Sequence, residues 1–116
     1  MDRHKPLARR VPLKKRNAKR RAKLFDEQFG SVAFVKWVRM QSCVVPGCGA
    51  WPAEAAHVTS RGAGGTAEDI VPLCPWHHNE QHRSGVDTFQ AKHGVDLRSL
   101  AEWTQTRWTL YQGKRQ

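Results

Sequence analysis

The chain has 116 residues and a formal net charge of +10 at pH 7, with 39% hydrophobic and 26% charged residues. This length fits one domain, no apolar run approaches the roughly 20 residues that cross a bilayer, and no apolar segment of a secretory signal follows the basic N-terminus. Three cysteines, an odd number, suit metal binding in a reducing compartment better than a disulfide framework, so we expect a cytoplasmic protein that does not bind membranes.

All of the excess positive charge lies at the N-terminus. Residues 1–23 contain eleven Lys and Arg and one acidic residue, whereas residues 24–116 contain nine of each kind. A segment this basic, with two prolines and little apolar periodicity, is typical of disorder in the free state. We predict a disordered arm over 1–23 that binds double- or single-stranded DNA through its phosphates; a solubilising tail or a localisation signal is the alternative. The folded domain is predicted over 24–116.

One helix and two short strands are predicted in the first half of the domain. The glycine and serine at 30–31 form a break and an N-cap, and the dense apolar residues that follow predict a helix over about 31–40 with its aromatic rings in the core. Apolar runs at 55–58 and 70–73 predict short strands on either side of a glycine-rich loop. Pro72 places the second strand at an edge or at a break in the ladder.

Three further helices are predicted in the second half of the domain. Pro75 suits the first position of a helix, Gly94 suits the position just after a helix, and Asp96 suits an N-cap. We expect Trp103 and Trp108, which belong to the apolar stripe of the last helix, to lie in the core. The predicted helices cover about 75–83, 87–93 and 97–111.

Two short-spaced pairs of metal-binding residues indicate a structural zinc site. Cys43 and Cys48 form the first pair, and Cys74 and His77 form the second pair about 25 residues later. Such pairs let the backbone curl round one ion, and four protein ligands fill the tetrahedral sites of zinc. The alternative is a set of buried free thiols with an incidental histidine.

A second histidine pattern begins where the first ends. His78 and His82 are four residues apart, so they lie on one face of the predicted helix, where two imidazoles can bind one divalent ion. His57 faces that ion if the first strand forms the opposing wall. Cleavage of a phosphodiester bond needs this combination of a metal ion and a base that activates water. Helical phase pairs His78 with His82, although His77 and His78 are adjacent and an exchange of their roles stays open.

Residues 54–82, EAAHVTSRGAGGTAEDIVPLCPWHHNEQH, resemble the motif of the HNH (ββα-metal) endonuclease family. Flanking segments around Trp37, Cys43 to Cys48 and Phe89 to Gly94 are similar to phage-encoded members that include the RecA-dependent recombination-enhancement nucleases. The resemblance extends over about residues 35–97. It implies an α+β fold with a small ββα-metal core over about 54–83, stapled by a structural zinc and flanked by helices.

The resemblance also implies roles for individual residues. His57 is the expected general base, and Asp69, at the central Asn position of the family, is expected to orient the loop or the His57 imidazole. The zinc ligands implied are the three cysteines with His77, and the ligands implied for a catalytic Mg²⁺ or Mn²⁺ are His78 and His82. Many family members have a further metal ligand directly before the base, where this chain has Ala56.

These features together predict a hydrolase that cuts DNA with little sequence specificity. The implied setting is a phage-encoded nuclease in the cytoplasm of a bacterial host, with a recombinase filament as a candidate partner. Ala56 favours an alternative, a non-catalytic zinc-knuckle module that binds DNA or docks on another protein. The same fold acting on RNA is a third possibility, which aromatic stacking on unpaired bases would distinguish.

Overall fold

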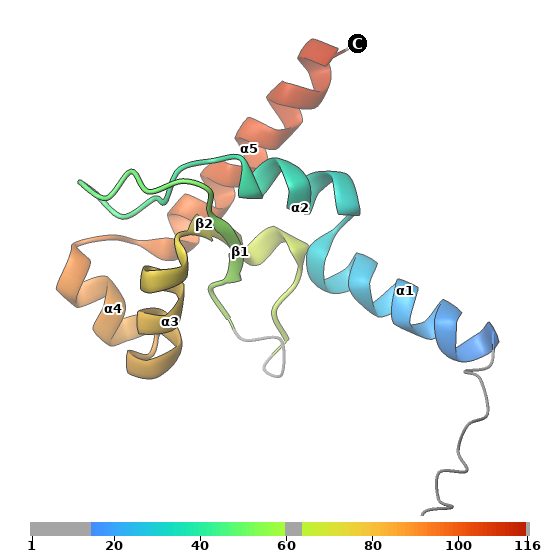
Figure 1. Cartoon of the computed structure of the whole chain (residues 1–116), viewed down its shortest axis with the longest axis horizontal. Coiled ribbons are helices and arrows are strands. Elements are labelled where there is room, and N and C mark those ends of the chain that lie inside the picture. The colour runs from blue at the N-terminus through green and yellow to red at the C-terminus, as the bar shows by residue number, and fades with distance from the viewer. Residues whose placement is uncertain (1–14, 60–63, 116) are drawn as a thin grey trace, which may run out of the picture.

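A computed structural model describes residues 15–59 and 64–115 of the chain. Within these ranges the fold is α+β, as predicted: helices surround one small two-stranded sheet (Figure 1). No helix of the described ranges is both long and apolar enough to cross a bilayer. In chain order the elements are α1 (Lys15–Phe29), α2 (Val32–Arg39), β1 (Glu54–His57), the 3-10 turn η3 (Ala67–Asp69), β2 (Ile70–Leu73), α3 (Pro75–Ser84), α4 (Val86–His93) and α5 (Leu97–Arg115).

The two strands form an antiparallel pair in which Ala56 lies opposite Val71 and His57 opposite Ile70. Successive side chains of a strand point to opposite faces, so β1 directs Glu54 and Ala56 to one face and Ala55 and His57 to the other. Pro72 has no N–H to donate and lies in β2, which pairs with β1 on one side only. On the other side of β2 the Pro72 carbonyl accepts a hydrogen bond from Val44 N at 3.0 Å. The edge position predicted for Pro72 is confirmed.

Each face of the hairpin has its own hydrophobic cluster. On the Ala56 face, the buried side chains come from β1, β2, the segment after Cys43, α4 and α5, and Phe89 and Leu97 are fully buried among them. On the other face, Phe34 and Val38 of α2 pack with Ile70, and Trp108 of α5 covers them. The hairpin therefore separates a cysteine-containing core from a smaller aromatic core.

The basic N-terminal segment differs from the prediction where it can be seen. Residues 15–23 belong to α1, whereas we expected disorder up to residue 23. After Pro12 the sequence KRNAKRRAKLFDEQF consists mostly of strong helix formers, and the helix is anchored at its end by Phe29, whose ring packs edge-on against His57 at 4.8 Å. Figure 1 shows the rest of α1 projecting away from the hairpin. Residues 1–14 of the predicted arm lie outside the described residues.

The other helices begin and end close to the predicted residues. Ser31 caps α2 by accepting a hydrogen bond from Phe34 N at 3.0 Å, Pro75 occupies the first turn of α3, and Gly94 ends α4 in the left-handed conformation. α5 continues four residues beyond the predicted 111.

The expected burial of the α5 tryptophans is wrong for one of them. Trp108 is half-buried, but Trp103 is 51% exposed. The stripe of α5 that reaches the core is narrower than the sequence pattern indicates, because Leu97, Ala101 and Thr104 fill it. Trp103 instead packs under the Arg107 guanidinium, whose carbon lies 4.7 Å from the ring centroid.

Candidate metal centre

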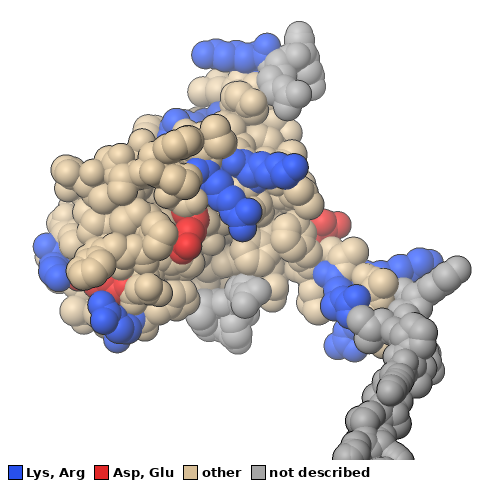
Figure 2. Space-filling view, viewed as in Figure 1, with Lys and Arg blue, Asp and Glu red and all other residues tan. Residues whose placement is uncertain are grey.

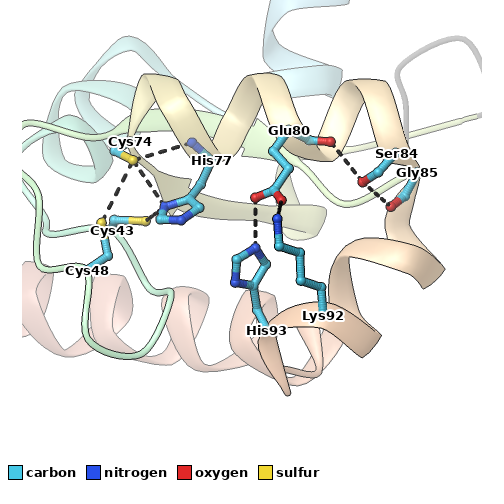
Figure 3. A network of polar contacts seen from close by, with 9 residues as sticks. All are labelled: Cys43, Cys48, Cys74, His77, Glu80, Ser84, Gly85, Lys92 and His93. Atoms are coloured by element: carbon cyan, nitrogen blue, oxygen red, sulfur yellow. Dashed lines mark hydrogen bonds and ion pairs between the residues drawn. The ribbon is translucent and has the colours of Figure 1, made fainter.

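Cys43, Cys48, Cys74 and His77 lie close together, with all four ligand atoms within 4.8 Å of one another (Figure 3). His77 Nδ1 is 3.4 Å from Cys43 Sγ and 3.2 Å from Cys74 Sγ, and the sulfurs of Cys48 and Cys74 are 3.9 Å apart. Zn–S bonds of about 2.3 Å and Zn–N bonds of about 2.0–2.1 Å require ligand atoms roughly 3.5–3.8 Å apart at the corners of a tetrahedron. The arrangement is therefore compatible with a zinc site.

Local backbone structure brings each pair of ligands together. The Cys43–Cys48 loop is closed by the hydrogen bonds Cys48 N to Val45 O and Cys43 N to Ala50 O, of 3.0 and 2.9 Å, and Gly47 supplies the positive φ of +81° that the turn needs. Cys74 is the N-cap of α3, and its sulfur accepts a hydrogen bond from His77 N. Both residues of the second pair thus lie in or next to the first turn of α3, which brings their side chains together.

Burial changes the proton affinities at this cluster. Burial raises the pKa of Cys43 to about 11, while a backbone hydrogen bond from Ala50 lowers the pKa of the half-buried Cys48 thiol. Burial also lowers the pKa of His77, which keeps its imidazole neutral and able to bind a metal at neutral pH. A buried Cys43 thiolate requires a compensating positive charge, which a bound cation provides.

A network that the sequence did not reveal lies beside His77, on the side away from the cysteines (Figure 3). Glu80 of α3 accepts hydrogen bonds from Lys92 Nζ at 2.5 Å and His93 Nε2 at 2.7 Å, and these bonds lower the pKa of Glu80 to about 2. The His93 ring lies edge-on to the His77 ring with centroids 5.1 Å apart. The network fixes α4 against α3 and limits the positions open to the His77 ring.

His78 and His82 lie together on α3, as helical spacing predicted. Their Nε2 atoms are 3.1 Å apart, and the rings are 4.7 Å apart. On its other side His78 Nδ1 donates a hydrogen bond to Glu54 Oε1 of β1 at 2.7 Å. Glu54 was not predicted as a site residue, because it is 24 positions away in the sequence and only the packing of β1 on α3 brings it there.

His57 lies on the opposite face of β1 from Glu54, beside α1. Its Nε2 donates a hydrogen bond to Gln28 O at 2.5 Å. The backbone carbonyl of His57 accepts a hydrogen bond from Gln81 Nε2 of α3 at 3.0 Å. The structure thus joins the end of β1 to α3, but it directs the His57 ring to the α1 side rather than toward His78. Ala56, which does share a face with Glu54, is fully buried.

Asp69 holds the loop that follows β1. Its Oδ2 accepts a hydrogen bond from Thr59 N at 2.6 Å, and its Oδ1 lies 3.6 Å from Arg98 Nη1. Asp69 was expected to orient either this loop or the His57 imidazole, and the contacts with Thr59 and Arg98 are contacts of the first kind. Most of the glycine-rich segment that the loop contains lies in residues 60–63, outside the described residues.

Comparisons with known proteins give a family for the chain. No solved structure matches it. The "Uncharacterized protein YdfU" of Escherichia coli (strain K12) is 36% identical in an alignment of 69 residues that covers 55% of this chain and 19% of that protein, so the chain spans about a fifth of the length of this relative. The sequence profile of the family described as "Protein of unknown function (DUF968)" matches residues 19–110, and the chain belongs to that family.

Proposed function

We propose that the protein is a metal-dependent HNH-type endonuclease that hydrolyses DNA with little sequence specificity. One observation carries the proposal: the contact series from Glu54 through His78 to His82. A histidine that donates one ring N–H to a carboxylate presents its other nitrogen in a fixed direction, an arrangement common at metal sites. In His78 that other nitrogen lies 3.1 Å from His82 Nε2, a separation suited to two ligands of one ion.

A divalent cation would be held by the Nε2 atoms of His78 and His82. Mg²⁺ or Mn²⁺ there would complete its coordination with water and phosphate oxygens, and when bound it supplies positive charge to the scissile phosphate and leaving oxygen. Glu54 would keep the His78 ring in place. The closed Cys43, Cys48, Cys74 and His77 cluster would bind zinc in a structural role, since four protein ligands leave no position for substrate.

His57 is the residue we assign to proton removal from the attacking water. Its hydrogen bond to the Gln28 carbonyl fixes a proton on Nε2, so the neutral ring carries its basic lone pair on Nδ1. The bond between Gln81 and the His57 carbonyl ties this residue to α3 one position before His82. The proton taken from water would be accepted at Nδ1.

Affinity for DNA would come from basic side chains of α1. Lys19, Arg20, Arg21 and Lys23 are exposed on a helix that projects from the domain (Figure 1). Contacts of Lys and Arg with phosphates release counterions and position a protein on DNA, but they do not read its sequence.

A non-catalytic zinc-knuckle module that binds DNA or docks on a protein is the second candidate, and Ala56 favours it. Ala56 occupies the position of a further metal ligand in many HNH enzymes, and here it is fully buried in the core. The His57 ring also lies on the opposite face of β1 from Glu54. The first observation removes one protein ligand from a catalytic ion, and the second directs the expected base away from His78 and His82.

Plasmid cleavage separates the two candidates. Zinc-loaded protein is incubated with supercoiled plasmid, single-stranded DNA and RNA in the presence of Mg²⁺ or Mn²⁺, with and without a recombinase filament on the single strand. Cleavage of DNA that falls by about 10²-fold or more in His57→Ala is expected for loss of a general base. Equal cleavage by the wild type and His57→Ala would contradict the assignment.

Trp76→Ala is the matched control, because Trp76 is 74% exposed on the same helix as His82. Prepared in parallel, it should cut like the wild type, which excludes a contaminating nuclease as the source of differences. His82→Ala should lose both cleavage and Mn²⁺ binding. Retained zinc and DNA binding without cleavage of any substrate would support the non-catalytic module.

A further inference from the structure

An aromatic groove lies between α2 and α5. It has a volume of about 730 Å³ and is lined by three aromatic and three basic side chains together with Ala33, Met40, Gln41 and Leu110. None of the ten lining residues is acidic. We call this surface the aromatic groove; its aromatic and basic residues are Lys36, Trp37, Arg107, Trp108, Tyr111 and Lys114.

The three rings form a partly exposed wall. The Trp37 centroid is 5.4 Å from that of Trp108 and 6.0 Å from that of Tyr111, and the Trp108 and Tyr111 rings are stacked at 5.8 Å. Tyr111 is 41% exposed, and the two tryptophans are half-buried. Their inner edges are held by Phe34 of the small core, 5.5 Å from Trp108. The wall is therefore fixed in position while its outer part stays accessible.

The positive charges are arranged round this wall. Arg107 is held over the Trp37 ring, with its guanidinium carbon 5.5 Å from the centroid, and it donates a hydrogen bond to Gln41 Oε1 at 2.7 Å. Lys36 and Lys114 are exposed on the two helices. Figure 2 shows Lys and Arg side chains over α2 and at the end of α5 on the visible face.

We propose that the aromatic groove binds single-stranded nucleic acid, with unpaired bases stacked on the aromatic wall and phosphates paired with the surrounding cations. Aromatic platforms edged by Lys and Arg bind single strands in this way because every base has a π face. Duplex DNA keeps its bases stacked on one another and offers only phosphates to such a surface. An acidic peptide would match the charge but would leave the rings without planar partners.

The proposal concerns binding and does not depend on whether the protein cuts DNA. Affinities are measured by fluorescence anisotropy without added Mg²⁺ or Mn²⁺, using labelled oligo(dT) and oligo(U) of 15 nucleotides. The comparison ligands are an abasic strand with the same number of phosphates and a blunt hairpin duplex. Wild-type protein should bind both base-containing strands more tightly than the abasic strand. The ratio of the affinities for oligo(dT) and oligo(U) shows whether the groove prefers DNA or RNA.

Tyr111→Ala should weaken binding of the base-containing strands by about 5- to 10-fold, within the range for removal of one stacking platform. Binding of the abasic strand and the duplex should change less than twofold. Tyr111→Phe keeps the ring and should restore wild-type affinity. Trp76→Ala removes an exposed aromatic ring outside the groove and should have no effect on any ligand. The melting temperature of each variant is compared with that of the wild type to exclude unfolding.

Charge variants separate the groove from α1. Replacing Lys36 and Lys114 by alanine should reduce single-strand binding more than duplex binding, whereas the same change at Lys19 and Lys23 of α1 should reduce both alike. Equal affinity for abasic and base-containing strands would overturn the proposal. So would displacement of oligo(dT) by a polyglutamate peptide at the same concentration of negative charge, because the surface would then recognise charge alone.

Discussion

If Cys43, Cys48, Cys74 and His77 bind zinc as we propose, removal of that ion should unfold the domain. Two of these ligands, Cys43 and Cys74, are themselves members of the larger hydrophobic cluster and are 6% and 5% exposed. Without a cation, the two thiols must stay buried and protonated or move into water. The second cluster is smaller: within the described residues its fully buried members are Phe34, Val38 and Ile70.

The size of this effect follows from comparing the free energy that a structural zinc contributes with the free energy of unfolding of a whole domain. A structural zinc contributes an apparent 10–16 kcal/mol, roughly, at pH 7, while the free energy of unfolding of an ordinary domain is about 5–15 kcal/mol. The metal-free chain should therefore have a free energy of unfolding near or below zero. Because burial raises the pKa of Cys43 to about 11, zinc binding at neutral pH must displace protons, and affinity for zinc should fall as the pH is lowered.

Chelation with excess EDTA, followed by urea titration and far-UV circular dichroism, tests this expectation. Cys74→Ser should resemble the chelated wild type, and His77→Cys, which keeps four zinc ligands, should stay folded and retain one zinc ion. Calorimetric titration of zinc in buffers of different ionisation enthalpy measures the protons released. Chelated protein with an unchanged urea midpoint would refute the reasoning, since the core would then be stable without the ion.

Four further changes test separate parts of the structure. Phe89→Ala should lower the free energy of unfolding by about 3–5 kcal/mol in urea titrations, because the ring is fully buried; a change below 1 kcal/mol would mean that the site collapses. Ser31→Ala should cost about 1 kcal/mol through loss of the α2 cap, and Ser31→Asp should cost little. Asp69→Ala should cost about 1 kcal/mol by removing the acceptor of Thr59 N, whereas Asp69→Asn should retain it; equal losses would point to charge instead. Glu54→Ala should weaken Mn²⁺ binding by about 10- to 100-fold in calorimetry while zinc content is unchanged, and unaltered Mn²⁺ affinity would remove Glu54 from the metal site.

Local signals predicted the elements and the metal-ligand pairs well. The caps at Ser31 and Gly94 and the proline at the start of α3 each act within a few residues, so the sequence contains the whole cause of those helix boundaries. The same is true of Cys74 and His77, which are brought together by the first turn of α3. That this pair meets Cys43 and Cys48 was predictable from ligand count, because two half-sites with borderline ligands can share one ion.

Features that depend on packing between distant segments were not predictable in the same way. The face to which His57 points is set by the register between two strands of four residues each, and a shift of one residue would reverse it. Helix formation at 15–23 is favoured by residue propensities, but the density of charge in the sequence indicated disorder. Glu54 and the aromatic groove arise from contacts across 24 residues and between α2 and α5, respectively.

The hydrogen bond from Val44 N to the Pro72 carbonyl also limits how the protein can assemble. Exposed strand edges are templates on which other chains add strands. On the outer side of β2, one carbonyl is already used by the segment after Cys43, and Pro72 offers no N–H beside it. We therefore expect the loop that carries the first two cysteines to oppose the addition of another strand along β2.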